Sequence, residues 1–180
     1  MTNVFIFHGT GGYPEENWFP WLKDKLGNKG FNVVVPQFPT PEDQNPEKWF
    51  EVLEEYKELI TPATIIFGHS LGGTFLLRVL EKLGIQIEKA IFIATPIGIL
   101  PIKNIQTDQS FLDKDFDWLK IKKNANKFFV FHSDNDPFVC LENGQQLASH
   151  LGVNLSFIPN AGHFNSASGY KKFEELLKVI

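Results

Sequence analysis

Short apolar runs recur along the chain, and longer segments separate them. The runs are rich in Phe, Val and Ile, and few polar residues interrupt them. They cover residues 4–7, 33–35, 65–67, 90–94, 128–131 and 155–158. Strands that are buried on both faces of a parallel sheet have this composition. The pattern therefore predicts a mostly parallel sheet of about six strands.

The segments between these runs carry apolar residues at helical spacing. After Asn45, which suits a helix cap, and Pro46, which suits a first helical position, the apolar stripe is Trp49, Val52, Leu53, Tyr56 and Leu59. Residues 71–83 are apolar on most faces, as in a helix packed against a sheet, and Gly84 is expected to end it. Ser168 is expected to cap a last helix with the stripe Tyr170, Phe173, Leu177 and Ile180. Weaker helical patterns cover residues 18–26 and 144–151.

Strands that alternate with helices predict an α/β fold, here a three-layer α/β/α sandwich with right-handed crossovers. A single domain, 1–180, accounts for the whole length. The irregular stretch 96–126 is too long for an ordinary connection between strands. It is expected to add a helix over the sheet edge, to form a lid or pocket-covering insertion, or to do both.

Composition narrows the classes of partner. Lys and Arg number 17 and Asp and Glu number 21, without a basic block or stripe, which argues against a nucleic-acid partner. No stretch approaches the roughly 20 apolar residues that cross a bilayer, and no secretory signal is visible. We therefore expect a cytoplasmic protein that does not bind membranes. The single cysteine, Cys140, excludes an intrachain disulfide, and neither a metal nor a cofactor is expected.

The strongest local motif is Gly68-His69-Ser70-Leu71-Gly72, which matches G-x-S-x-G. It lies between a buried strand and an apolar helix, the context in which this motif forms a nucleophile elbow. Ser70 must then occupy a sharp, strained turn, so its neighbours must be small. The helix that follows adds a positive dipole where an oxyanion would form. The motif predicts that Ser70 is a nucleophile.

A serine nucleophile needs a base to accept its proton. His163 follows the last strand, at the sheet edge where Ser70 is also expected, and it fits the chain order Ser, Asp, His. His132 ends the fifth strand at the same edge and is the competing candidate. The other histidines have other expected roles. His8 is expected to shape the loop after the first strand, His69 to point away from the serine, and His150 to lie in solvent.

The base needs a carboxylate to orient it, and the loop after the fifth strand holds two. Asp136 precedes Pro137, which favours an extended conformation at the start of a loop. Asp134 suits a turn in which its side chain bonds its own backbone two residues on. We favour Asp136 as the orienting acid, with Asp134 as the alternative.

An oxyanion hole requires two backbone N–H groups. Leu71, directly after the nucleophile, is expected to supply one. The other is expected from the loop after the first strand, where glycines allow the backbone to approach a reacting carbonyl. Thr10 is our choice there and Gly11 the alternative. The glycine spacing of this loop does not match that of a nucleotide-binding loop.

Together these motifs resemble the α/β-hydrolase superfamily, and more closely the small serine hydrolase family that contains retinoblastoma-binding protein 9 and the bacterial YdeN-type proteins. The resemblance rests on compact size and on these segments: His8-Gly9, Trp18 with Trp21, the Gly68–Gly72 elbow, Asp134-Asn135-Asp136-Pro137 and Gly162-His163-Phe164. It implies a nucleophile at Ser70, an acid at Asp136 and a base at His163. It also implies a reduced hydrolase sheet with the strand order 2-1-3-4-5-6.

The resulting expectation is a carboxylesterase-like serine hydrolase that cleaves an ester or related acyl bond of a small molecule through an acyl-enzyme on Ser70. Acyl transfer to another acceptor would use the same residues. The alternative is a module that keeps this fold and acts through protein contacts, since fold does not fix function. Substrate-pocket candidates are Trp18, Phe111 and Trp118, although aromatics in a chain with 18 Phe more often belong to the core.

Overall fold

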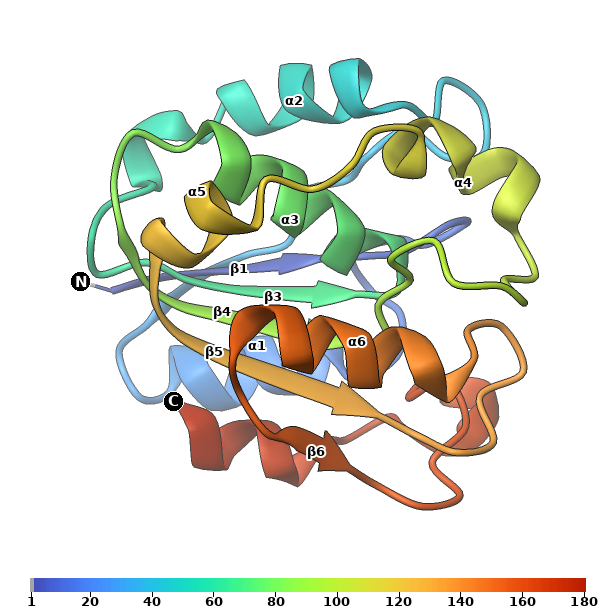
Figure 1. Ribbon diagram of the computed structural model, residues 1–180. Helices are drawn as coiled ribbons and strands as arrows, with labels where there is room; N and C mark the ends of the chain where they lie inside the picture. Colours follow the sequence, from blue (N-terminus) through green and yellow to red (C-terminus); the bar gives the residue numbers. More distant parts are fainter. Residues whose placement is uncertain (1) are drawn as a thin grey trace.

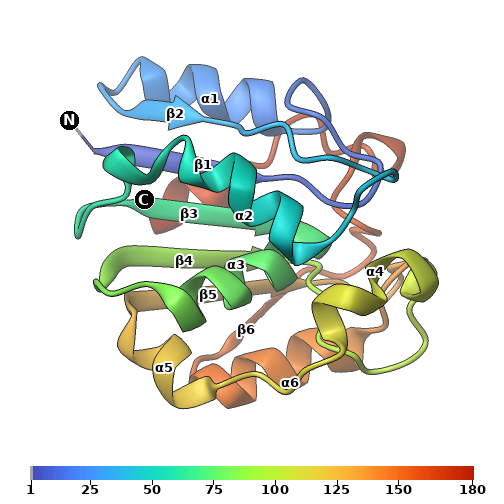
Figure 2. The same ribbon diagram turned by 90° about the horizontal axis from the view of Figure 1, so that it is seen from above.

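The computed structural model describes residues 2–180, and within them six strands form one parallel sheet in the order β2-β1-β3-β4-β5-β6. The strands are β1 (Asn3–Phe7), β2 (Asn32–Val34), β3 (Ile65–His69), β4 (Ile87–Ile93), β5 (Ala125–His132) and β6 (Leu155–Phe157). Figure 1 shows their arrowheads at one end of the sheet, and Figure 2 shows the order from one edge to the other. The predicted sheet, including its strand order, is confirmed.

Helices cover both faces of this sheet. They are α1 (Phe19–Gly27), α2 (Pro46–Glu54), α3 (Leu71–Lys82), α4 (Ile105–Leu112), α5 (Trp118–Lys123) and α6 (Leu141–Leu151). One hydrophobic core joins Phe75 of α3 to residues of α2, α4, α5 and α6. A second core lies on the opposite face, where Phe19 of α1 and Phe173 near the end of the chain pack against the strands. These two cores make the predicted three-layer sandwich (Figure 1).

The start of α2 follows from its sequence. The side chain of Asn45 accepts a hydrogen bond from the Lys48 N–H at 2.9 Å, and Pro46 occupies the first turn. Trp49 and Leu53 are buried against the sheet. The helix ends at Glu54, and the last apolar residue of the predicted stripe, Leu59, lies on a short 3-10 helix, Lys57–Leu59.

The predicted last helix is wrong. Two 3-10 helices, Ser166–Ser168 and Glu174–Val179, occupy this stretch. Asn165, rather than Ser168, caps the first of them, and its side chain accepts a hydrogen bond from the Ser168 N–H at 3.0 Å. Gly169 then takes a positive φ of 89°, which turns the chain away from a continuous helix. Burial of Phe173 holds this segment against the sheet despite the irregular backbone.

The stretch 96–126 contains α4 and α5. Arg78 of α3 anchors it, because Nε donates to the Phe111 carbonyl at 3.0 Å and the guanidinium also bonds the carbonyls of Lys114 and Asp115. The guanidinium lies 4.0 Å from the centroid of the Phe116 ring. The stretch therefore adds two helices, which pack against α3 rather than over an edge strand as predicted, and a lid function stays a prediction. Among residues 2–180, no helix has the length and apolar character needed to span a membrane.

Candidate active site

Ser70 lies at the turn between β3 and α3, at the carboxyl end of the sheet. Its φ of 53° and ψ of −126° are unfavourable for a residue with a side chain and cost about 1–3 kcal/mol. The Ser70 N–H donates to the Ile93 carbonyl at 2.8 Å, which ties the turn to the end of β4. At Gly72 a Cβ would overlap the Phe7 carbonyl group. The strained turn therefore depends on close backbone packing, as the motif predicts.

His163 and Ser70 line the same hollow of about 120 Å³. The His163 ring is nearly buried, and its Nδ1 lies 2.7 Å from Oδ2 of Asp136. Because a carboxylate can only accept, Nδ1 is the donor in this contact. The neutral ring then leaves Nε2 unprotonated and able to accept a proton.

Asp136 is held in place independently of the histidine. Its side chain is 0% exposed, and Oδ1 accepts hydrogen bonds from the Phe138 N–H at 2.8 Å and the Val139 N–H at 3.1 Å. The alternative acid, Asp134, is exposed and accepts from the Asn160 N–H at 2.8 Å, not from its own turn as expected. The structure thus pairs His163 with Asp136.

Four consecutive side chains, 133–136, contact four consecutive residues, 160–163. Ser133 Oγ accepts from the Ala161 N–H at 2.9 Å, and Asn135 Oδ1 accepts from the Gly162 N–H at 2.7 Å. With the contacts of Asp134 and Asp136, they fasten the acid loop to the loop that carries His163. Sequence reasoning missed Ser133 and Asn135. The sequence did carry one indication of these contacts, because both loops follow strands that end at the same edge of the parallel sheet.

His69 is among the residues that line the hollow at Ser70, and its buried ring packs against Trp18 and Phe19. Its Nε2 donates to the His163 carbonyl at 2.8 Å. Burial, aided by the nearby His163, lowers the pKa of His69 to about 3, so its ring is neutral. The neighbouring Trp18 Nε1 donates to the Phe164 carbonyl at 3.1 Å. Both residues hold the backbone of the loop that carries His163.

The remaining histidines have other contacts. His132, the competing base, is buried outside the hollow; its Nε2 donates to the Val139 carbonyl at 3.1 Å, and burial lowers its pKa. His8 shapes its loop as predicted. The Phe38 N–H donates to His8 Nε2 at 3.0 Å, so His8 Nδ1 carries the proton and donates to the Gly9 carbonyl at 2.9 Å. His150 is exposed, as expected, and stacks on Trp118.

The loop after β1 packs directly against the elbow. A Cβ at Gly9 would lie 2.8 Å from Ser70 Cβ, so glycine permits this approach. The Gly11 N–H donates to Thr40 Oγ1 at 2.6 Å and is therefore engaged. In the part of the chain that the structure describes, neither the Thr10 N–H nor the Leu71 N–H donates to a backbone carbonyl. The two predicted candidates in this loop are Thr10 and Gly11, and of these only Gly11 donates its N–H to Thr40.

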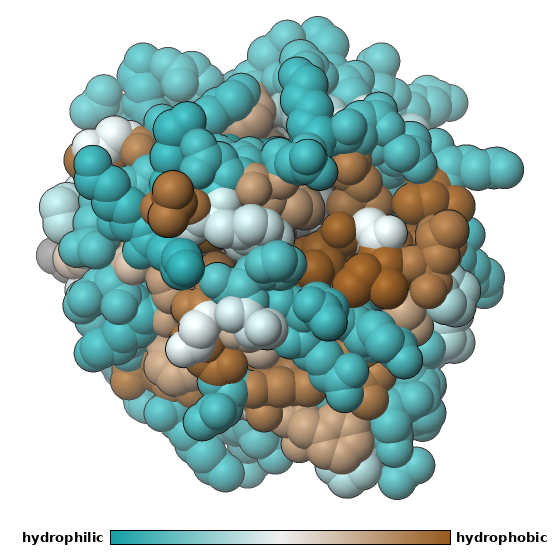
Figure 3. All heavy atoms as spheres, viewed as in Figure 1, coloured by the Kyte–Doolittle hydropathy of each residue, from teal (hydrophilic) through white to brown (hydrophobic). Residues whose placement is uncertain are grey.

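The aromatic pocket candidates lie elsewhere. Trp18 and Phe111 are fully buried, one in each core, because their neighbours are apolar side chains of the sheet and helices. Trp118 lines a separate hollow of about 660 Å³ together with Ile97, Ile99 and His150. Figure 3 shows apolar side chains gathered toward one side of the face on which α6 lies. None of these three aromatics lines the hollow at Ser70, and a role in a substrate pocket stays a prediction.

The hollow at Ser70 has a polar lining. Besides the elbow, His163 and the loop after β1, the lining consists of Glu16, Asn17, Asn104, Phe138 and Asn165. Burial raises the pKa of Glu16 to about 7, so this carboxyl group titrates near neutrality. Sequence reasoning missed Glu16 and Asn104, because no motif marks either of them. Their positions follow only from how the loop before α1 and the 96–126 stretch pack at this end of the sheet.

Known proteins are similar to this chain in sequence and in fold. A family model described as serine hydrolase matches residues 4–180. The chain is 28% identical to the hydrolase YdeN of Bacillus subtilis (strain 168), over 98% of this chain and 93% of that protein. It is 26% identical to the serine hydrolase RBBP9 of Rattus norvegicus, over 99% of this chain and 94% of that one.

Solved structures share this fold. The crystal structure of the ydeN gene product from B. subtilis matches with a TM-score of 0.92 and 28% identity, over 99% of this chain and 96% of that one. Est1E from Butyrivibrio proteoclasticus has the same fold, with a TM-score of 0.71 and 16% identity, over 99% of this chain and 84% of that one. The chain therefore belongs to the serine hydrolase family, in the group that includes YdeN and RBBP9.

Proposed function

We propose that the protein is a carboxylesterase-like hydrolase that cleaves an ester or related acyl bond of a small molecule through an acyl-enzyme on Ser70. The observation that carries the proposal is the 2.7 Å hydrogen bond from His163 Nδ1 to the buried carboxylate of Asp136, beside the strained Ser70 in one hollow. A serine of this kind becomes a nucleophile when an oriented imidazole accepts its proton.

In the first half of the reaction, Ser70 Oγ attacks the acyl carbonyl carbon and its proton passes to His163 Nε2. Asp136 holds the ring in the required tautomer and stabilises the imidazolium that forms. The carbonyl oxygen becomes an oxyanion, which the N–H groups of Leu71 and Thr10 stabilise. The tetrahedral intermediate then collapses, and the leaving alcohol takes the proton from His163.

In the second half, a water molecule attacks the acyl-enzyme and gives its proton to His163. The second tetrahedral intermediate releases the carboxylic acid, and Ser70 regains its proton from the imidazolium. An alcohol or amine in place of water would give acyl transfer, which uses the same groups. The hydrolysis-to-transfer ratio in the presence of added alcohol measures the preference.

The substrate class follows from the lining of the hollow. Its volume of about 120 Å³ and its asparagine, glutamate and hydroxyl groups suit a short, polar acyl group rather than a long chain. Among the residues that the structure describes, no Lys or Arg lines the hollow. Small neutral or cationic substrates are therefore favoured over anionic ones.

The test uses a fluorophosphonate probe and p-nitrophenyl esters from acetate to octanoate. The wild-type protein should be labelled on the peptide that contains Ser70, and kcat/KM should fall as the acyl chain lengthens. Ser70→Ala should fold normally, remain unlabelled and lose nearly all turnover. Absence of labelling in the folded wild-type protein, or labelling that survives Ser70→Ala, would reject the proposal and favour a module that acts through protein contacts.

A further inference from the structure

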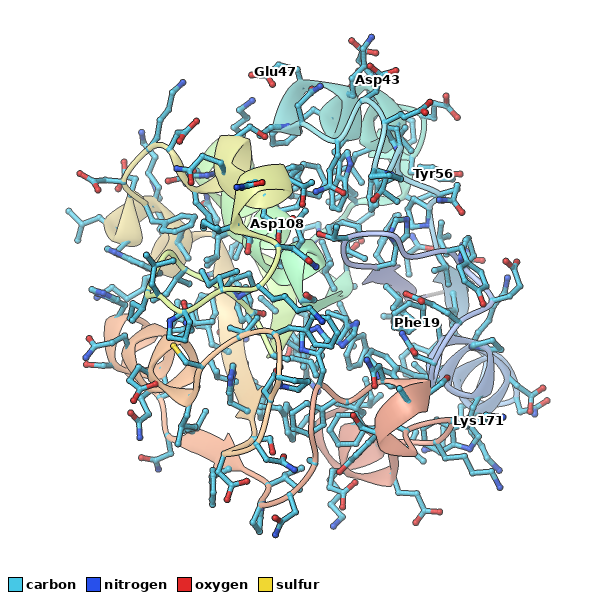
Figure 4. The ribbon with its side chains drawn as sticks, turned by 90° about the vertical axis from the view of Figure 1, so that its right-hand side faces the viewer. Phe19, Asp43, Glu47, Tyr56, Asp108 and Lys171 are labelled. Carbon is cyan, nitrogen blue, oxygen red and sulfur yellow. The ribbon has the colours of Figure 1, made fainter. Side chains whose placement is uncertain are left out.

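A buried carboxyl group from α4 reaches the loop after β1. Asp108 is 3% exposed, and its Oδ1 accepts a hydrogen bond from Thr10 Oγ1 at 2.6 Å. Gln44 Nε2 donates to the same oxygen at 2.9 Å. Figure 4, which looks onto the carboxyl end of the sheet, shows Asp108 on α4 at this end of the molecule. The stretch 96–126 is thereby bonded to a residue of the candidate oxyanion hole.

Packing alone does not require a carboxyl group here. Burial raises the pKa of Asp108, and the hydrogen bonds from Thr10, Thr107 and Gln44 oppose this effect. Within residues 2–180, no Lys or Arg forms an ion pair with Asp108. Burying such a group is unfavourable unless its hydrogen bonds are satisfied. One of the donors that satisfy it is the hydroxyl of Thr10, the residue whose N–H is predicted to stabilise the oxyanion.

The same network holds the next residue of the loop. The Gly11 N–H donates to Thr40 Oγ1 at 2.6 Å, and Thr40 Oγ1 donates to Gln44 Oε1 at 2.5 Å. Gln44 in turn bonds Asp108. Two consecutive loop residues are therefore attached to one group of hydrogen bonds, which ends at the buried Asp108.

The peptide group between Gly9 and Thr10 is fixed from its other side. Its carbonyl accepts hydrogen bonds from His8 Nδ1 at 2.9 Å and from the Gly12 N–H at 3.0 Å. In a planar trans peptide the N–H points opposite to the carbonyl. Holding the Gly9 carbonyl therefore sets the direction of the Thr10 N–H, while Asp108 sets the position of the Thr10 side chain.

We propose that Asp108 is a positioning residue for the oxyanion hole, which holds Thr10 from α4 so that its N–H meets the developing negative charge. This inference rests on the proposed function. It makes the 96–126 stretch part of the catalytic geometry rather than a cover alone. Removal of one oxyanion donor typically costs about 10²–10³ in kcat. Loosening the donor should cost less, about 10- to 100-fold, and KM should change little because the interaction acts in the transition state.

The experiment compares Asp108→Ala, Asp108→Asn and Thr10→Val with the control Asp113→Ala, which removes an exposed acid beside the end of α4. Asp108→Ala and Thr10→Val should each lose about 10- to 100-fold in kcat at nearly constant KM. Combining them should cost no more than either alone, since both remove one interaction. Asp108→Asn keeps an acceptor oxygen and should retain most activity. Affinity for a boronic acid, which forms a tetrahedral adduct with a nucleophilic serine, should fall in parallel with kcat/KM.

Three results would overturn the inference: kcat values like that of Asp113→Ala, a loss expressed only in KM, or losses that multiply in the double variant. If Asp108→Ala fails to fold, Thr10→Val, which keeps the backbone and nearly the shape of Thr10, decides alone. Failure of the proposed function has a different signature, because the wild-type protein would then show no labelling of Ser70. A labelled, active wild type in which Asp108→Ala and Thr10→Val keep the kcat of Asp113→Ala rejects the role of Asp108 and leaves the hydrolase.

Discussion

Asn135 Oδ1 accepts a hydrogen bond from the Gly162 N–H at 2.7 Å, one residue before the two partners of the Asp136–His163 pair. Gly162 has a positive φ of 57°, which glycine adopts readily, so the chain turns directly before His163. The contact therefore fixes the direction in which the chain enters His163.

Asn135→Ala should release this turn without touching either member of the pair. We expect a loss of about 1 kcal/mol in the free energy of unfolding. Thermal denaturation should show this loss as a fall in Tm of about 2–4 °C. Turnover should fall by about 10-fold, because a small displacement of a catalytic group is costly. Asn126→Ala, at an exposed position on β5, is the control; equal kinetics for the two variants would show that the Asn135 contact does not orient His163.

Asp136→Asn and Asp134→Asn should differ sharply. An amide at 136 favours the wrong tautomer of His163, which in such triads costs on the order of 10⁴ in kcat. An amide at 134 still offers an oxygen to the Asn160 N–H, so activity should stay within about 2-fold, as for a surface change. Steady-state kinetics on p-nitrophenyl acetate, with circular dichroism to confirm folding, measure both. A greater loss for Asp134→Asn would reverse the assignment of the acid.

Ser70→Gly should be more stable than Ser70→Ala, although both are inactive. The φ of 53° at this position strains alanine as it strains serine, whereas glycine adopts it readily. We expect glycine to gain about 1 kcal/mol over alanine after allowance for its more flexible unfolded state. Urea denaturation of the two variants measures the difference. Equal midpoints would show that the elbow stores no strain.

Sequence reasoning succeeded where a local pattern has one physical solution. The buried runs predict the strands, Asn45 with Pro46 predicts the start of α2, and the glycines around Ser70 predict a strained turn. Chain order also predicts the side chains that the structure places together, His163 and Asp136.

Two of the failures depend on packing between distant segments, and the third is a local break in the backbone. In the sequence alone, an aromatic residue such as Trp18 is equally consistent with the hydrophobic core and with the lining of a pocket. Its neighbours in the fold decide, and here they are core side chains. The bond from Thr10 to Asp108 joins residues 98 positions apart, and no motif marks the aspartate. The apolar stripe near Phe173 is real, but Gly169 breaks the helical path that its spacing suggests.

The last prediction concerns the stability contributed by Glu16. Burial in the hollow raises its pKa from an ordinary 4.5 to about 7, so between these values the folded state holds a proton that the unfolded state has lost. Stability then falls as pH rises through this window, because the unfolded state binds fewer protons. Glu16→Gln removes the titrating group and should abolish this part of the pH dependence.

Thermal denaturation of both proteins from pH 4 to pH 8.5 tests the sign. Below pH 4.5 the wild-type protein and the Glu16→Gln variant both carry a neutral side chain at position 16, and their Tm values should differ by a constant amount. Above pH 7 the wild-type carboxylate is charged in a partly buried place, so the glutamine variant should gain relative to the wild type. The gain should be about 2–4 °C, the shift that corresponds to roughly 1 kcal/mol in a protein of this size. The matched control is Glu15→Gln, because Glu15 is the exposed neighbour of Glu16 and lies outside the hollow, and the relative Tm of Glu16→Gln should rise with pH more than that of this control. A pH dependence for Glu16→Gln equal to that of the control would show that Glu16 titrates at its ordinary value, and a relative loss above pH 7 would mean that the charged form is stabilised in the fold.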